Sequence, residues 1–417
     1  MGQDLHSGRR PDIAARQAAR ATALVAQVAE AVARGQPADA TLQFFFRAHR
    51  ECGSRDRKFM GDLVFSFFRW KGWLPESPLE TACALAWALD AGSPHPSATA
   101  LSGGEPPPPS GRLTLEEKAI LVARRLNLDA PPRPADLLPS WVPASLAGHA
   151  DRFIEAIQRR PPAWVRVRQG HVPAVRAALE REKIPASPQA VVTCALALPG
   201  SSPLQRLAPD LRTRFEVQDL ASQAVGLLAA PQAGENWWDA CAGSGGKALH
   251  LADLMGNRGR IVASDIRADA LARLRQRARR AGCAIIRMSP AAETGGPPFD
   301  GVLVDAPCSG LGTWSRNPDA RWRTAAGDPE RRAAVQADIL GRAAQRVRPG
   351  GRLVYSVCTL TRRETLDSTD EFLRAHPEFR LEPGAHPLSG ADTDGRFWIW
   401  PWDGPCDGMY AARFRRG

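Results

Sequence analysis

The chain has 417 residues, 44% of them hydrophobic and 24% charged, a composition that excludes a disordered protein and predicts two or three globular domains. No run approaches the roughly 18 apolar residues of a membrane span, and the first ten residues lack the apolar middle of a signal peptide, so we expect a cytoplasmic protein with no membrane partner. The net charge of +11 favours a nucleic-acid partner, although the arginine-rich composition encoded by a high-GC genome would give the same charge.

The first 90 residues are predicted to form an all-helical domain. Alanine, leucine and valine recur at helical spacing from Asp12 to Ala33, and two aromatic-rich stretches repeat the pattern further on. Residues 91–112 are so rich in proline and glycine that we interpret them as a loop or linker.

Residues 113–158 are predicted to be a helical connector. Thr114 and Glu117 have the spacing of a capping box, which indicates that a helix begins there. An amphipathic helix is expected at the other end of the connector, from Pro143 to Arg159.

Residues 159–210 show a strand, a helix and a second strand, which predicts a small α+β segment. Its first strand carries Arg166 and Arg168, which we expect to be exposed. They could contact RNA phosphates, and a solvated strand face explains them equally well.

Residues 211–417 alternate short apolar strands with helices. That pattern predicts a mostly parallel, doubly wound α/β sheet. Sheets of this kind bind ligands beyond the carboxyl ends of their strands. We therefore search those ends for the functional residues.

A glycine-rich loop follows the strand that ends at Asp239 and leads into a helix. Glycines let a backbone approach a ligand closely, and a helix N-terminus offers free N–H groups. The loop is not a phosphate-binding P-loop, because Cys241 stands where that motif begins with glycine and Ala248 follows Lys247. Nor does it match the dinucleotide-binding pattern G-x-G-x-x-G, so alone it is a weak signal of cofactor binding. Its residues are Cys241, Ala242, Gly243, Ser244, Gly245, Gly246 and Lys247.

The next strand ends at Asp265, where a carboxylate can accept hydrogen bonds from ribose hydroxyls. The alternative is an N-cap for the following helix. With the glycine-rich loop beside it, the ribose role is preferred, and a cofactor that carries a nucleoside is implied.

The eight cysteines form no C-x-x-C pair, which argues against a disulfide framework and against a zinc site, so we expect free thiols and no metal. Two of them hold comparable positions. Cys308 follows Pro307 just beyond the strand that ends at Asp305, and Cys358 ends another strand. In a doubly wound sheet both would face one crevice, although cysteines at strand ends are often small core residues.

Five stretches together resemble the Sun-type RNA cytosine-5 methyltransferases, in particular the bacterial members that act on small-subunit (16S) ribosomal RNA. They are "FEVQDLASQ", "DACAGSGGK", "DAPCSGLGTWSRNPDARW", "YSVCTLTRRE" and "DGPCDGMYAARFRR". The resemblance covers almost the whole chain. It implies a Rossmann-like methyltransferase domain, preceded by a helical NusB-like RNA-binding domain and the small α+β segment.

The resemblance also implies a chemistry. The cofactor would be S-adenosyl-L-methionine, held by the loop from Cys241 to Lys247 and by Asp265. Cys358 would be the nucleophile that adds to C6 of cytosine, since C5 is too weakly nucleophilic to be methylated unaided. Cys308 would assist release, and Asp305 would contact both the base and the cofactor. RNA is the expected partner of a monomeric enzyme.

The sequence departs from the family at two places. Ser244 replaces a proline in the glycine-rich loop, and near the third strand neither Ser289 nor Glu293 aligns with the acidic residue expected beside adenine, which we leave unassigned. Two other readings stay open. One is a DNA cytosine-5 methyltransferase, in which Cys308 would attack, and the other is a non-catalytic RNA-binding assembly factor.

Overall fold

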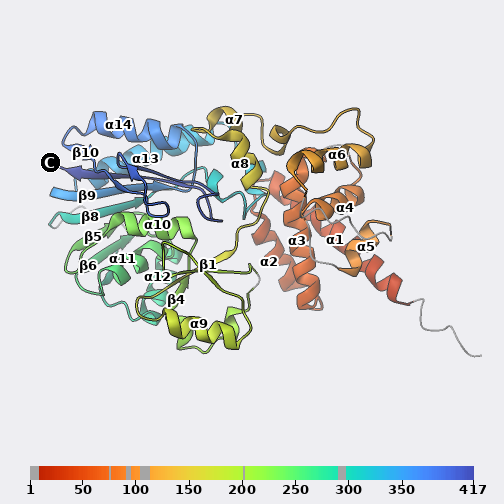
Figure 1. Cartoon of the computed structure of the whole chain (residues 1–417), viewed down its shortest axis with the longest axis horizontal. Helices are drawn as coiled ribbons and strands as arrows, with labels where there is room; N and C mark the ends of the chain where they lie inside the picture. The colour runs from red at the N-terminus through yellow and green to blue at the C-terminus, as the bar shows by residue number, and fades with distance from the viewer. Residues whose placement is uncertain (1–8, 75–76, 91–94, 104–112, 201, 290–296) are drawn as a thin grey trace, which may run out of the picture. The chain divides into compact units, whose positions relative to one another are not determined.

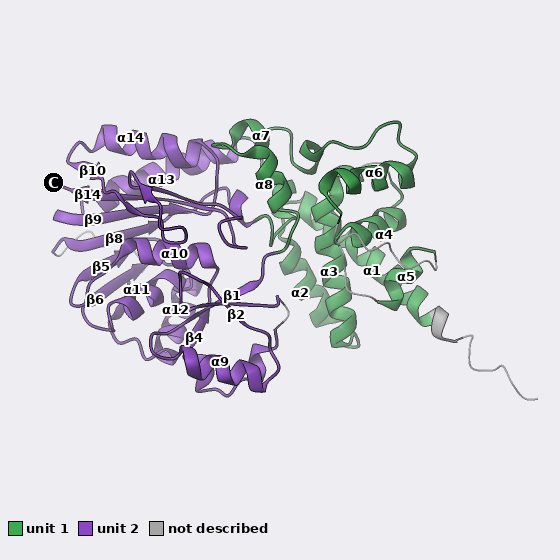
Figure 2. Cartoon of the chain, in the orientation of Figure 1, with its two compact units in different colours: residues 1–160, 314–326 green, residues 161–313, 327–417 purple. Residues whose placement is uncertain are grey.

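The computed structural model describes residues 9–74, 77–90, 95–103, 113–200, 202–289 and 297–417, which form two compact units (Figure 2). Unit 1 is Met1–Arg160 with Trp314–Ala326, and unit 2 is Pro161–Thr313 with Gly327–Gly417. The chain therefore passes between the units three times. Among the described helices, none has both the length and the apolar character that a membrane crossing requires. The predicted division into five domains stays a prediction.

Unit 1 is helical. The buried positions of its first helix, including Leu24, Val25, Val28 and Val32, follow the spacing that predicted it, because residues three and four apart share a helix face. The elements are α1 (Arg9–Ala33), α2 (Ala38–Ala48), α3 (Ser54–Trp70), η1 (Lys71–Trp73), α4 (Leu79–Leu89), α5 (Pro96–Leu101), α6 (Leu115–Leu126), η2 (Pro134–Leu137), α7 (Val142–Ser145) and α8 (Ala150–Ala156) (Figure 1).

The capping box before α6 is confirmed. The hydroxyl of Thr114 accepts the N–H of Glu117 at 3.2 Å, and the Glu117 carboxylate accepts the N–H of Thr114 at 2.7 Å. These two bonds satisfy donors that a helix start otherwise leaves unpaired.

Two predictions for unit 1 are wrong in part. Within the predicted linker, residues 96–101 form α5, which buries Ser97 and Ala98, while residues 91–94 and 104–112 lie outside the described residues. The single helix expected from 143 to 159 is broken into α7 and α8, because Gly148 and His149 have φ angles of 141° and 55°, which a continuous helix does not allow.

Residues 314–326 belong to unit 1 although the chain reaches them from unit 2. Arg321 is fully buried and donates to the carbonyl of Leu137 at 3.1 Å. The indole of Trp322 donates to the carbonyl of Phe68 at 2.7 Å. Side chains from this segment thus satisfy backbone carbonyls of the helical unit.

Unit 2 begins with a small antiparallel sheet of order β2-β3-β1-β4. Arg166 in its first strand is buried and forms an ion pair with Asp253, which also binds Arg168 at 2.8 Å. The expectation that both arginines are exposed is wrong, because both pair with one carboxylate of a helix that is distant in the sequence. The elements are β1 (Ala163–Val167), α9 (Val172–Arg181), β2 (Ser187–Pro188), β3 (Ala195–Leu198) and β4 (Phe215–Val217).

The main sheet of unit 2 has the order β10-β14-β9-β8-β5-β6-β7, with β13 paired to β14. Strands β5 to β9 along this order are parallel, and β14 is antiparallel to β9. Helices α10, α11 and α12 cover one face, and α13 and α14 cover the other (Figure 1). The neighbouring residues Trp237 and Trp238 enter the two opposite cores, as the pleat of a strand requires. The predicted α/β Rossmann-like class is confirmed.

The elements of this part of the chain are α10 (Leu220–Ala229), β5 (Asn236–Asp239), α11 (Gly246–Leu254), β6 (Arg260–Ser264), α12 (Ala268–Arg280), β7 (Ile286–Ser289), β8 (Phe299–Asp305), η5 (Leu311–Thr313), α13 (Asp328–Ala344), β9 (Val347–Val357), η7 (Arg363–Asp367), α14 (Ser368–Ala375), β10 (Phe379–Leu381), β11 (Gly384–Ala385), β12 (Asp392–Thr393), β13 (Arg396–Ile399) and β14 (Met409–Arg416).

Candidate active site

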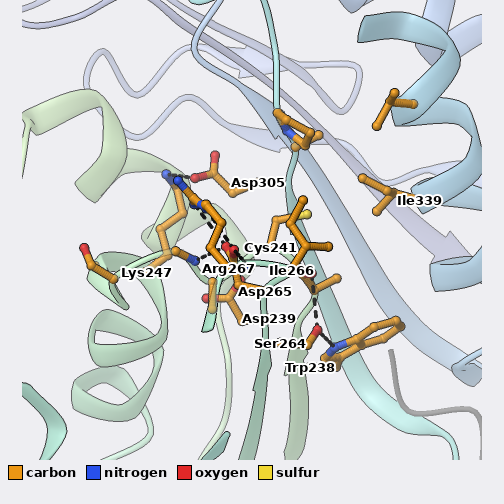
Figure 3. Close-up of a pocket in the computed structure, with 18 of the residues that line it drawn as sticks. Trp238, Asp239, Cys241, Lys247, Ser264, Asp265, Ile266, Arg267, Asp305 and Ile339 are labelled. Atoms are coloured by element: carbon orange, nitrogen blue, oxygen red, sulfur yellow. Dashed lines mark hydrogen bonds and ion pairs between the residues drawn. The ribbon is translucent and has the colours of Figure 1, made fainter. Parts of the chain in front are cut away.

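A cavity of about 900 Å³ lies at the carboxyl ends of β5, β6 and β8 (Figure 3). This is the edge of a parallel sheet at which ligands bind. The loop after β5, residues 241–247, is called the glycine loop below. It lines the cavity except at Gly245.

Two residues of the glycine loop adopt backbone conformations that favour glycine. Gly243 and Gly245 have φ angles of 53° and 90°. A Cβ on Gly245 would also lie 2.0 Å from Cδ1 of Leu274 in α12. Gly245 therefore lets α11 begin close to α12, and it serves the packing of the loop while its neighbours face the cavity.

Asp265 follows β6 and lines the cavity. Its carboxylate accepts the N–H of Gly243 at 2.8 Å and the N–H of Arg267 at 2.9 Å, and it forms an ion pair with the Arg267 guanidinium. Burial opposes ionisation, but the hydrogen bonds from Arg267 and Gly243 lower the pKa of Asp265. Arg267, and not Asp265, is the N-cap of α12, so the capping alternative is wrong.

Asp239, at the end of β5, faces the cavity with an unpaired carboxylate (Figure 3). The side chain is buried, and among the described residues neither of its oxygens makes a hydrogen bond of good geometry; the nearby backbone N–H of Cys241 only partly offsets the burial. Burial and then repulsion from Asp305 raise the pKa of Asp239 to about 7. A buried carboxylate without a partner is costly and marks a position where a ligand can supply one.

Lys247 joins the glycine loop to the next strand of the sheet. Its ammonium group lies 2.8 Å from Oδ2 of Asp305, and the hydroxyl of Ser356 donates to Oδ1 at 2.9 Å. Both oxygens of Asp305 are thereby held in fixed directions where this residue lines the cavity. Its contact with the base and the cofactor, which the family resemblance implies, stays a prediction.

The two predicted catalytic cysteines are brought together. Their Sγ atoms lie 3.3 Å apart, and all eight cysteines of the chain are free thiols. Neither cysteine lines the cavity, but Ala306 and Pro307 of the same turn do. Residues 306–309 are called the cysteine turn below. The hydrogen bond with Cys358, burial, and the nearby negative charges raise the pKa of Cys308 well above that of a free thiol.

The sequence interpretation missed the apolar wall of the cavity. Ile266 is 98% exposed, and Val335 and Ile339 of α13 line the same space. The sequence feature that could have predicted this wall is the isoleucine inside the polar turn after β6. Ser289 is not among the lining residues, and Glu293 lies outside the described residues.

Comparison with known proteins agrees with this geometry. Residues 226–415 match the family model described as "16S rRNA methyltransferase RsmB/F". Over these residues the chain is similar to the RsmB/F family. The RsmB/F region contains the glycine loop, the cysteine turn and Cys358, which confirms the resemblance to Sun-type methyltransferases.

Two relatives of the chain are named as ribosomal RNA methyltransferases. "Ribosomal RNA small subunit methyltransferase B" of Salmonella paratyphi B is 33% identical over 262 residues, which are 59% of this chain and 61% of that protein. "Probable ribosomal RNA small subunit methyltransferase B" of Bacillus subtilis is 35% identical over 214 residues, 48% of this chain and 47% of that protein. The chain thus spans about half to three fifths of the curated relatives it matches.

A solved structure shows how far the fold is shared. The crystal structure of PH0851 has a TM-score of 0.73 and 24% sequence identity, and it covers 95% of this chain and 99% of its own. The fold is therefore shared with a protein of quite different sequence.

Proposed function

We propose that the chain methylates C5 of a cytosine in RNA, with S-adenosyl-L-methionine as methyl donor and small-subunit (16S) ribosomal RNA as substrate. The observation that carries the proposal is the pair of thiols 3.3 Å apart at the ends of two neighbouring strands, beside the cavity. The names of the relatives support the ribosomal substrate. A monomeric enzyme in the cytoplasm is part of the proposal.

The cavity fits S-adenosylmethionine. That molecule carries positive charge, and Asp239 offers it a buried carboxylate with no partner. The apolar wall at Ile266 and Val335 suits the flat face of adenine, while Asp265 is ionised to accept ribose hydroxyls. When bound, S-adenosylmethionine supplies an electrophilic methyl group.

The two thiols divide the work on the base. The Cys358 thiol would lose its proton to water and add to C6, and the electron pair of the C5–C6 double bond would become available at C5. C5 would then take the methyl group as the S–CH3 bond of the cofactor breaks with its electrons staying on sulfur. Water then removes the C5 proton, the C5–H electron pair restores the ring double bond, and the S–C6 bond breaks with its electrons returning to Cys358. The thiol of Cys308 donates a hydrogen bond to the departing thiolate. Asp305 accepts a hydrogen bond from the amino group of cytosine.

The test is denaturing gel electrophoresis of variants incubated with RNA and cofactor. Cys358→Ala should abolish both methylation, by at least about 10⁴-fold, and the covalent protein–RNA adduct. Cys308→Ala should let the adduct accumulate. Cys194→Ala, a half-buried cysteine of the small sheet, is the matched control and should behave as the wild type.

Each competing function gives a different result. A DNA-type enzyme would lose the adduct in Cys308→Ala and keep it in Cys358→Ala, which would overturn the assigned roles. An assembly factor would show no methylation in the wild type. Bisulfite sequencing of ribosomal RNA from a deletion strain tests the substrate, and an unchanged small-subunit pattern would contradict it.

A further inference from the structure

A short π-helix, η7 (Arg363–Asp367), follows Cys358 by five residues and places Glu364 in the interior of unit 2. Single π-turns are rare and often occur at functional sites. The Glu364 side chain is fully buried, where an unpaired carboxylate would be costly. Its partners therefore explain why the chain retains a charge there.

The Glu364 carboxylate receives a donor at every available position. Oε1 accepts the N–H of Ser309 at 2.9 Å and the amide of Gln336 at 3.0 Å. Oε2 accepts the hydroxyls of Ser309 and Thr361. Burial raises the pKa of Glu364, and the hydrogen bonds from Ser309, Thr361 and Gln336 oppose that rise. Because an ionised carboxylate only accepts hydrogen bonds, these four donors favour the charged form.

The same network reaches both sides of Cys308. Gln336 also donates to the carbonyl of Pro307 at 3.0 Å, so Glu364 and Gln336 together hold the residues before and after the cysteine. On the far side, the hydroxyl of Tyr355 contacts Oε1 of Gln336 at 2.8 Å and the carbonyl of Glu364 at 2.7 Å. The cysteine turn is thus held by buried hydrogen bonds from three elements, β9, α13 and η7.

The charges around Cys308 are those of its partners in this network. Besides the contact with Cys358, the negative charge of Glu364 favours the protonated thiol, and the buried hydroxyl of Tyr355 interacts electrostatically with Cys308. No positive group is among the principal influences on Cys308 in the described part of the chain. A thiol in such surroundings holds its proton.

We propose that Glu364 is a positioning residue that fixes Cys308 against Cys358 and, by its charge, keeps Cys308 in the thiol form while Cys358 attacks. This inference rests on the proposed function, because it explains how two adjacent thiols take different roles. Cys358 is left as the one sulfur able to attack, and Cys308 keeps the proton with which it stabilises the departing thiolate.

The test measures the reactivity of Cys308 in the absence of RNA and cofactor. In a Cys358→Ser background, the rate of alkylation of Cys308 by iodoacetamide is followed by peptide mass spectrometry between pH 6 and pH 11. Glu364→Gln keeps the size of the side chain and removes its charge, so the midpoint of the rate profile should fall by about one pH unit or more. Ser309→Ala removes the hydroxyl that contacts Glu364 and Thr359 and keeps the charge of Glu364, so its midpoint should stay where it was.

Glu364→Asp is the second variant, because it keeps the charge and shortens the reach. Its midpoint should stay near that of the background protein, while resolution of the RNA adduct slows. The proposal is overturned if a folded Glu364→Gln leaves the midpoint unchanged, or if Glu364→Asp lowers it as much. Should Glu364→Gln not fold, the resolution of the RNA adduct by Glu364→Asp decides, because an unchanged rate would contradict the positioning role.

The alkylation readout separates this inference from the proposed function. If the wild type fails to methylate RNA but Glu364→Gln shifts the Cys308 profile, the function is wrong and the control of the thiol stands. If the wild type methylates RNA and the profile does not shift, the inference alone fails.

Discussion

The glycine loop and the cysteine turn follow neighbouring strands of one sheet, but they are completed in opposite ways. The cysteine turn is held by a fully paired buried carboxylate, Glu364. Beside the glycine loop, Asp239 is buried with no partner, and Ile266 points into solvent. The cavity is built to receive charge and apolar surface from a ligand, whereas the thiols are preorganised by the protein itself.

Among the tests of this comparison, the largest expected effect is on the affinity of the cavity for its ligand. Asp239→Asn should weaken the binding of S-adenosylmethionine at pH 8 by roughly 30- to 100-fold, because a buried charge pair loses one partner. Isothermal titration calorimetry measures this affinity. An unchanged affinity would mean that the carboxylate does not contact the ligand.

The pH dependence sharpens the same prediction. The pKa of Asp239 is raised to about 7 in the free protein, where Asp305, Lys247, Asp265 and Cys241 surround it, so protons compete with the ligand below that pH. Affinity in the wild type should therefore rise about tenfold between pH 6 and pH 8. Asp239→Asn should abolish the rise. Asp265→Asn is the matched control: the pKa of Asp265 is lowered, so that variant should bind more weakly with the pH dependence intact.

The next effect is on folding of the glycine loop. Gly245→Ala should lower the free energy of unfolding by about 2 to 3 kcal/mol, because it adds a side chain at a φ of 90° and 2.0 Å from Leu274. Gly243→Ala should cost only about 1 kcal/mol, since the atom nearest to its Cβ is 3.6 Å away, on Arg267. Urea denaturation compares the two. Equal losses would show that packing against Leu274 does not matter.

The smallest effect separates stability from activity. Tyr355→Phe should lower the free energy of unfolding by about 1 kcal/mol and slow the release of methylated RNA several-fold. The substitution removes the hydroxyl that hydrogen-bonds with Gln336 and with the carbonyl of Glu364. Tyr410→Phe removes a comparable buried bond, to Thr369 at 2.9 Å, outside this network. It should lose similar stability and keep its activity. Single-turnover kinetics and thermal melts test the pair, and identical kinetics would argue against the network.

Local patterns predicted the parts of this molecule that depend on neighbours in sequence. The capping box at Thr114 and the parallel sheet could both be predicted, because the spacing of apolar residues in helices and strands repeats within a few residues. The same spacing placed Cys308 and Cys358 at strand ends. The two thiols come close together because their strands are neighbours in the sheet. The family resemblance, and not the pattern, assigned their roles.

Contacts between residues far apart in the chain could not be predicted from the sequence. Arg166 looks exposed in an alternating strand, and only the fold shows that Asp253, 87 residues further on, neutralises it. Glu364 stands inside a stretch that carried the resemblance, but its contact with Ser309 spans 55 residues, so its role could not be read there. Asp239 was noticed as the end of a strand, and its unpaired state became visible only with its surroundings.

The route of the chain through residues 314–326 bears on how such proteins arise. This segment interrupts unit 2 shortly after the cysteine turn, yet Arg321 and Trp322 find their partners in unit 1. Unit 1 is therefore no simple N-terminal addition that recombination could attach or remove in one event. A chain without the first 160 residues would leave residues 314–326 without the partners that they bind in unit 1.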